Sequence, residues 1–458
     1  MPLLLDSTSA YVRAAAPKVL AHDEPTAVPS AYWVRKSGDV FVRRGDPFAL
    51  ARARFDALGE RITSLPACGR FMTALRADER AAPQIGLLVG IPGSWRQLTI
   101  EELCAQPVAQ ACAHVALGLD FEPAVARATQ EFVEGLYCDS FEFVSIAPLH
   151  GVKYAGSGFD FIPQVRVEPL TDDEMSRCLH SGIVQTLVST VDEEWPRTQV
   201  GLTTRFKIRK DVGGKPREEE RASARHEEAL AGGRLERALE ALHVYKEGAI
   251  SAPSVLSYGR NWPVSGGWSF VSIPGRVRPS YGSEYLLSES DADRIPPFVK
   301  RLERVRRDDV VDSACRRFSY AADRERVDDA LVDLIIAAES LFLGDAGSAR
   351  EKGEMRYRLA LRAAFYLESE PDRRRATYDL VRKLYDLRSA IVHGGRPSHR
   401  DLRLGEDVHD LPYFAREAER VIRRALHQVI ATAGESGRKI DWETVVFSDA
   451  SSKATRED

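Results

Sequence analysis

The sequence predicts an α+β protein, with an all-α helical bundle in its C-terminal third and a larger mixed α/β region before it. Three observations lead to this prediction. Apolar residues recur every three or four positions through most of residues 299–435, which is the spacing of amphipathic helices. Short stretches of alternating apolar and polar residues, typical of half-exposed strands, lie mainly within residues 136–298. Glycine, proline and charged residues separate the two kinds of segment.

Composition limits the class of protein. The 458 residues are enough for two or three domains, and the 44% hydrophobic content is enough for a buried core. No apolar run is long enough for a membrane span, so we expect no membrane contact. The six cysteines include no Cys-x-x-Cys pair, which favours reduced thiols in a cytoplasmic protein and argues against a zinc site. We expect neither a metal site nor a cofactor.

Charge limits the kind of partner. The net charge of −4 means that the chain as a whole is not a polycation. A contact with nucleic acid would therefore need a local basic surface.

Residues 1–135 are expected to form a mixed region, to which we assign no chemistry. Asp46 followed by proline is a typical helix start, with the Asp as N-cap. The apolar run 85–91 predicts a short buried strand. Thr99 opens a capping box, which predicts another helix, and one more is expected over 122–136.

Residues 136–298 are expected to form a β-rich α+β module. Alternating patterns predict strands at 159–161, 165–167 and 200–208. The charged, glycine-containing segment 210–225 is expected to be an exposed loop, and 230–245 an amphipathic helix.

Residues 299–435 are expected to form the helical bundle. Helices are predicted over 327–343, 355–367 and 374–392, and from an N-cap at Asp410 onward. The first and last of these have apolar faces that are expected to point inward: Leu331, Leu334, Ile335, Ala338, Leu341 and Phe342, and then Phe414, Ala418, Val421, Ile422, Ala425, Val429 and Ile430. Residues 436–458 are expected to be a polar tail.

The end of the helix over 374–392 holds two residues suited to phosphate chemistry. Arg388 lies three residues after Tyr385, within an apolar stripe, and His393 follows five positions later. Two glycines then end the helix, because glycine accepts the left-handed conformation that a helix end needs. Arginine stabilises anions, whereas histidine can also move protons near neutral pH. Held together, they are a minimal set for acting on a phosphodiester.

These residues resemble the signature of a known family. Arg388-Ser-Ala-Ile-Val-His393, followed by two glycines, resembles the HEPN motif, in which four to six residues separate an arginine from a histidine. The upstream helix over 327–343, which carries Glu339, makes the wider segment similar to Apea-like HEPN domains. The clear resemblance covers roughly residues 301–433.

The resemblance implies a fold and an activity. It implies a homodimer, because HEPN active sites form where two motif helices meet. It also implies RNA as partner, and metal-independent cleavage by attack of the 2′-hydroxyl on the adjacent phosphorus. His393 would act as general base or acid, and Arg388 would stabilise charge on the phosphoryl oxygens. Relatives in bacterial defence and toxin systems suggest such a role, with the N-terminal region as sensor or regulator.

Three further residues are expected to support this site. Glu339 lies on the apolar face of its helix, where it either orients Arg388 or His393 or forms a core salt bridge. Ser389 departs from many HEPN motifs, which carry Asn, Asp or His directly after the arginine. Tyr385 could stack on a base or sugar, although a tyrosine at such a position is more often part of a core.

Two alternatives remain at this stage. Some HEPN domains bind RNA or nucleotides, or act as adaptors, without cutting, and others could serve dimerisation alone. Arg416, Arg420 and Arg423 share one face of the last helix, where they either follow RNA phosphates or form a solvated surface.

Overall fold

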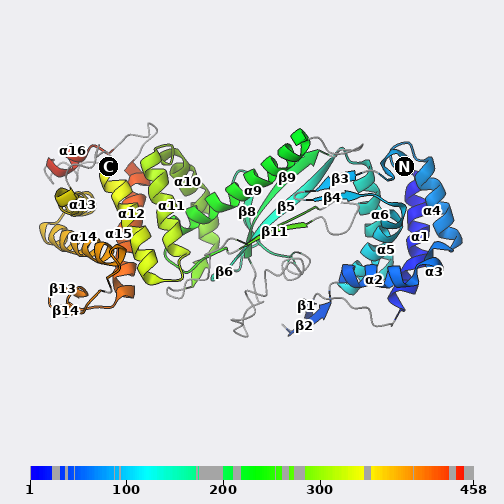
Figure 1. The fold of residues 1–458 in the computed structure, drawn as a ribbon, viewed down its shortest axis with the longest axis horizontal. Helices are drawn as coiled ribbons and strands as arrows, with labels where there is room; N and C mark the ends of the chain where they lie inside the picture. Colours follow the sequence, from blue (N-terminus) through cyan, green and yellow to red (C-terminus); the bar gives the residue numbers. More distant parts are fainter. Residues whose placement is uncertain are drawn as a thin grey trace. The chain divides into compact units, whose positions relative to one another are not determined.

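The computed structural model describes residues 2–22, 31–36, 40–45, 47–86, 88–91, 94–171, 174, 200–209, 218–252, 254–259, 268–272, 284–344, 352–395, 397–432 and 440–447. Within these residues the protein is an α+β fold that is mostly helical with small sheets, which confirms the expected class (Figure 1). The chain divides into two compact units. Unit 1 comprises Met1–Pro148, Glu168–Leu235 and Ser254–Ser272, and unit 2 comprises Leu149–Val167, Glu236–Pro253 and Ile273–Asp458.

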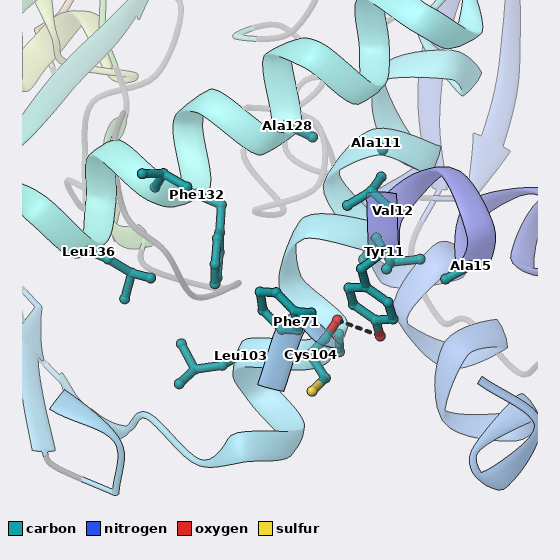
Figure 2. Close-up of a cluster of buried hydrophobic side chains, with 14 of the residues drawn as sticks. Tyr11, Val12, Ala15, Phe71, Leu103, Cys104, Ala111, Ala128, Phe132 and Leu136 are labelled. Carbon is teal, nitrogen blue, oxygen red and sulfur yellow. Dashed lines mark hydrogen bonds between the residues drawn. The ribbon is translucent and has the colours of Figure 1, made fainter. Parts of the chain in front are cut away.

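Helices pack around an apolar core in unit 1. They are α1 (Pro2–Leu20), α2 (Pro47–Leu58), α3 (Glu60–Thr63), α4 (Pro66–Ala77), α5 (Ile100–Ala116) and α6 (Phe121–Tyr137), with a 3₁₀ turn at Ala82–Gln84. At the centre, the rings of Tyr11 and Phe71 stack 5.0 Å apart (Figure 2). The Tyr11 hydroxyl, which is fully buried, donates a hydrogen bond to the Cys104 carbonyl at 3.1 Å. Burial raises the pKa of the Cys104 thiol to about 12, so this cysteine is a core residue with an unreactive thiol.

Strands of unit 1 form two hairpins and part of a sheet. The hairpins are β1 (Ala31–Lys36) with β2 (Val40–Gly45), and β3 (Leu88–Ile91) with β4 (Ser94–Gln97). The sheet has the order β11 (Trp268–Ser272), β10 (Ser254–Gly259), β5 (Ser140–Leu149) and β9 (Val200–Arg209). β10 runs antiparallel to both β11 and β5. The strand predicted over 200–208 is confirmed as β9, and the strand predicted over 85–91 begins three residues later.

Helix α9 (Glu218–Tyr245) corrects one expectation. The predicted helix over 230–245 is present, but it begins at residue 218. The expected loop over 210–225 is therefore wrong for 218–225, and its first part lies outside the described residues. Glutamate, arginine and alanine dominate the start of α9, and these strong helix formers extend the helix without an apolar stripe.

Unit 2 contains helices throughout most of residues 299–435, where the sequence predicted them. Its helices are α10 (Glu289–Val305), α11 (Asp309–Ala322), α12 (Val327–Leu343), α13 (Lys352–Leu367), α14 (Pro371–Val392), α15 (Leu411–Thr432) and α16 (Trp442–Phe447). Its strands are β6 (Val152–Tyr154) with β12 (Tyr285–Leu287), β7 (Phe159–Ile162) with β8 (Val165–Pro169), and β13 (Arg403–Leu404) with β14 (Asp407–Val408). No helix among the described residues is long and apolar enough to cross a membrane.

The core of the bundle lies where the apolar patterns placed it. Every residue of the two inward faces predicted on α12 and α15 is buried, and the two helices pack against each other. Asp410 accepts a hydrogen bond from the Tyr413 amide at 2.8 Å, which confirms the predicted cap of α15. Short helix α16 lies within the expected tail 436–458, and its Trp442 packs 5.6 Å from Phe342. Residues beyond 447 lie outside the described part. The division of the chain at residues 135, 298 and 435 stays a prediction.

A buried ion-pair network ties three helices of unit 2 together. Arg306 follows α10, and its side chain is only 1% exposed. It donates to Glu240 on α9 at 2.5 Å and to Asp312 on α11 at 2.8 Å. Burial raises the pKa of Glu240, although the attraction of Arg306 opposes this rise. Because a buried charge requires its partners, Arg306 fixes the positions of α9, α10 and α11 relative to one another.

Candidate functional site

The C-terminal end of α14 has the geometry that its two glycines predicted. His393 is the C-cap residue, and Gly394 follows with a φ of +78°, in the left-handed region. The Gly394 amide donates to the Ile391 carbonyl at 3.0 Å, and the Gly395 amide donates to the Ala390 carbonyl at 2.9 Å. These two bonds form a Schellman motif. Because the helix stops here, the side chain of His393 is exposed to solvent.

Arg388 lies just over one turn before this end and faces α12. Its Nη2 atom is 3.6 Å from Oε2 of Glu339, and each of the two side chains is about a quarter exposed, at 26% and 25%. The Nε atom of Arg388 is buried and has no hydrogen-bond partner among the described residues. The structure thus brings Glu339 to Arg388, while the contact leaves several guanidinium N–H groups available.

The environment of Glu339 disfavours its charge. Burial raises the pKa of Glu339, and the nearby guanidinium of Arg388 only partly opposes this rise. The folded state therefore binds this proton more tightly than the unfolded state does. Its contribution favours folding at low pH and is lost as the pH rises from the ordinary value of 4.5 through the raised folded value.

Glu339→Gln tests this electrostatic balance. Glutamine has the shape of the protonated carboxyl group and carries no charge at any pH. The variant is therefore expected to gain stability relative to wild type as the pH rises above 4.5, where the wild-type carboxyl group loses its proton. Urea unfolding of both proteins across this pH range measures the difference. A difference that does not change with pH would contradict the raised pKa.

Tyr385 and Ser389 lie on either side of Arg388 on α14. Tyr385 is half-buried, and burial raises its pKa, an effect that Glu339 increases and Arg388 opposes. Ser389 is partly exposed, and its carbonyl accepts the His393 amide at 3.1 Å. Tyr385 thus borders the pair of Arg388 and Glu339. The expected approach of the His393 imidazole to Arg388 stays a prediction.

Two arginines of the predicted basic stripe on α15, Arg420 and Arg423, have acidic partners. Arg420 pairs with Glu247 at 3.1 Å and with Glu417 at 2.6 Å. Arg423, whose side chain is 11% exposed, pairs with Glu419 at 2.5 Å and also donates to the His243 carbonyl. These carboxylates compensate the charge that could attract phosphates. Glu417 and Glu419 lie on α15 itself, and the bond of Arg423 to the His243 carbonyl joins α15 to α9. Contact of this stripe with RNA stays a prediction.

Arg416 differs from its two neighbours on α15. It is exposed, and the described part of the structure records no ion pair for it. A surface cavity of about 500 Å³ lies beside the other arginines and is lined by Glu247, Leu367, Arg420, Arg423, Arg424, His427 and Gln428. Arg424 also has a carboxylate partner, Glu368 at 2.8 Å. The cavity therefore lacks the excess positive charge that an anion would need.

Helix α13 contributes residues that the sequence analysis missed. Arg356 donates from Nη1 to both carboxylate oxygens of Asp386 on α14, at 2.8 and 3.1 Å. The next residue, Tyr357, is exposed and contacts the ring of Tyr378. The available signal was the sequence Arg-Tyr-Arg at 356–358, which places an aromatic residue between two arginines.

Comparisons with known proteins add no assignment. No family model matches the chain, and no curated protein or solved structure matches it either. The function is therefore inferred from the residues of α12, α13 and α14 and from their geometry.

Proposed function

We propose that unit 2 is a HEPN-type endoribonuclease domain, with its helices in the HEPN arrangement, that cleaves RNA without a metal ion. The observation that carries this proposal is the end of α14. Arg388 has spare donors there beside Glu339, and His393 is exposed where the Schellman motif stops the helix. An arginine and a histidine at this spacing match the HEPN motif.

The chemistry assigns one role to each side chain. The 2′-hydroxyl oxygen of the RNA attacks the adjacent phosphorus, and an imidazole of His393 accepts its proton as general base. The bond from phosphorus to the 5′-oxygen breaks, and an imidazolium returns a proton to that oxygen. Arg388 stabilises the charge that builds up on the non-bridging oxygens. The products are a 2′,3′-cyclic phosphate and a 5′-hydroxyl.

A homodimer supplies two copies of each residue to this reaction. If two α14 helices meet near their C-terminal ends, one His393 can act as base while the other acts as acid. Val392, next to His393, is 52% exposed and offers an apolar contact between the two α14 helices. Unit 1 would then serve as sensor or regulator, in a cytoplasmic defence or toxin role.

Glu339 has a positioning role in this proposal. At 3.6 Å it is close enough to orient the guanidinium, but too far for a strong hydrogen bond. Because burial raises the pKa of Glu339, the carboxylate competes weakly with an incoming phosphate for Arg388.

One observation favours the second candidate, a non-catalytic HEPN module that binds RNA or nucleotides. Among the described residues, neither the His393 imidazole nor the Ser389 hydroxyl has a recorded hydrogen bond. A general base usually needs a partner that fixes its ring and tautomer. A protein that binds RNA tightly without cutting it would correspond to this candidate.

The products of cleavage test the proposal. Wild-type protein incubated with RNA in the presence of EDTA is expected to leave 2′,3′-cyclic phosphate and 5′-hydroxyl ends, because the 2′-hydroxyl is the nucleophile. A 5′-hydroxyl end accepts a kinase label directly, without phosphatase treatment. A 2′,3′-cyclic phosphate end resists phosphatase until mild acid opens the ring, which identifies the second end. Fragments with 3′-hydroxyl and 5′-phosphate ends, or cleavage that stops in EDTA, would rule out this chemistry.

A further inference from the structure

Helices α13 and α14 form a locally basic part of an acidic chain. The two helices pack against each other in unit 2 (Figure 1). α13 carries four cationic residues and one acidic residue, and α14 carries six cationic and three acidic residues. The whole chain has a net charge of −4, so this pair of helices is unlike the average surface. Such a local surface is what a contact with nucleic acid requires.

Two tyrosines and an arginine lie together on this basic pair of helices. Tyr357 on α13 is 53% exposed, and its ring lies 6.1 Å from that of Tyr378 on α14, edge to face. The guanidinium of Arg382 lies 5.5 Å from the centre of the Tyr378 ring. We call Tyr357, Tyr378 and Arg382 the aromatic–arginine surface. An exposed tyrosine ring can stack on a base and a neighbouring guanidinium can contact a phosphate, so these three side chains fit a ligand with both flat faces and negative charge.

Arg356 and Tyr385 connect this surface to the candidate catalytic residues. Asp386 raises the pKa of Arg356, and Tyr378 and Tyr385 act in the same direction, so Arg356 lies within electrostatic range of both tyrosines. Tyr385 in turn lies within electrostatic range of Arg388. Along α14, the ten helical steps from Tyr378 to Arg388 span about 15 Å. That length corresponds to about four nucleotides at a stacked spacing of about 3.4 Å.

We infer that the aromatic–arginine surface binds single-stranded RNA. Bases stack on the rings of Tyr357 and Tyr378, and a backbone phosphate contacts Arg382. A single strand is the required form, because bases inside a duplex have no free face to stack on a side chain. The surface holds the substrate strand for cleavage at Arg388 and His393, and this last step depends on the proposed function.

The binding test uses a strand that cannot be cut. A fluorescently labelled, fully 2′-O-methylated RNA single strand has no free 2′-hydroxyl, so its anisotropy with the full chain reports binding alone. Tyr357→Ala is expected to raise Kd about five- to 150-fold, the loss of one stacked base. Tyr357→Phe is expected to bind like wild type, because the ring makes the contact. Arg382→Gln is expected to reduce the slope of log K against log salt by about 0.7.

Tyr320→Ala is the matched control. Tyr320, on α11, is a 36% exposed tyrosine outside this surface, and its replacement is expected to leave Kd unchanged. Equal affinities of the Tyr357→Ala and Tyr320→Ala variants would overturn the inference, as would a wild type that does not bind the strand. Sedimentation of the same variants adds one outcome. If Tyr357→Ala converts a dimer to a monomer, a second copy of the chain covers the surface and the inference is wrong.

Failure of the inference and failure of the proposed function give different results. A wild type that binds the methylated strand through Tyr357 but never cuts unmodified RNA keeps the binding surface and removes the nuclease. A wild type that cuts RNA, with no change of Kd in the Tyr357→Ala variant, keeps the nuclease and removes the binding surface.

Discussion

His393→Ala is expected to reduce the rate of RNA cleavage about 10²- to 10⁴-fold, which is the usual contribution of a general acid–base residue. General acid–base catalysis needs a group that can exchange protons near neutral pH, which is a property of imidazoles and not of guanidinium groups. A single-turnover cleavage assay in EDTA measures the chemical step directly. Affinity for the methylated strand is expected to stay within about twofold of wild type, since base stacking does not involve His393.

His399→Ala is the matched control for this substitution. His399 lies in the loop that follows α14 and is exposed like His393, but it is outside the motif. The His399→Ala variant is expected to cleave RNA at the wild-type rate. Because the side chain of His393 is solvent-exposed, the His393→Ala variant is expected to unfold at the same temperature as wild type. A loss of cleavage would then not come from a loss of folding. Equal cleavage by wild type and His393→Ala would place the active site elsewhere or reveal a contaminating nuclease.

Strong periodicity explains which helices could be predicted from the sequence. The apolar residues of the predicted inward faces of α12 and α15 repeat at helical spacing, and all of them are buried. Helices α1 and α11 were not among the predicted helices. Thr8 and Ala15 on α1, and Ala314 and Cys315 on α11, are fully buried, yet such small residues leave a weak pattern in the sequence. Their burial depends on packing partners from other helices, which local periodicity does not reveal.

The candidate site could be predicted only in part, for a similar reason. The motif and its glycines predicted the end of α14, and the apolar spacing around Glu339 predicted its inward position. By contrast, Glu247, which compensates the positive charge of Arg420, lies 173 positions before it in the sequence. The contact of Tyr357 with Tyr378 joins two helices. Tertiary contacts of this kind decide whether an arginine or a tyrosine is free for a ligand, and no local pattern contains them.

Arg306→Ala is expected to lower the free energy of unfolding by about 3–5 kcal/mol, because it leaves Glu240 buried without its partner. The Glu240 side chain is only 4% exposed, so water cannot replace the lost guanidinium. Asp312 loses less, since Arg237 and Arg316 remain within 2.6 and 3.2 Å of it. Urea unfolding of the full chain, followed by far-UV ellipticity, measures the shift. Arg326→Ala, which removes a 71% exposed arginine from its contact with Asp328, serves as control and is expected to change nothing measurable.

A double replacement separates the cost of an orphaned charge from the value of the pair. In Arg306→Met with Glu240→Leu, both buried charges are absent and the replacements are apolar, so most of the lost stability is expected to return. Recovery would mean that the pair specifies how α9, α10 and α11 meet, while the apolar core supplies the free energy. If the double variant is as unstable as Arg306→Ala, the network itself stabilises unit 2. The hydrogen bond of Arg306 to Asp312, which both variants lack, then supplies that free energy.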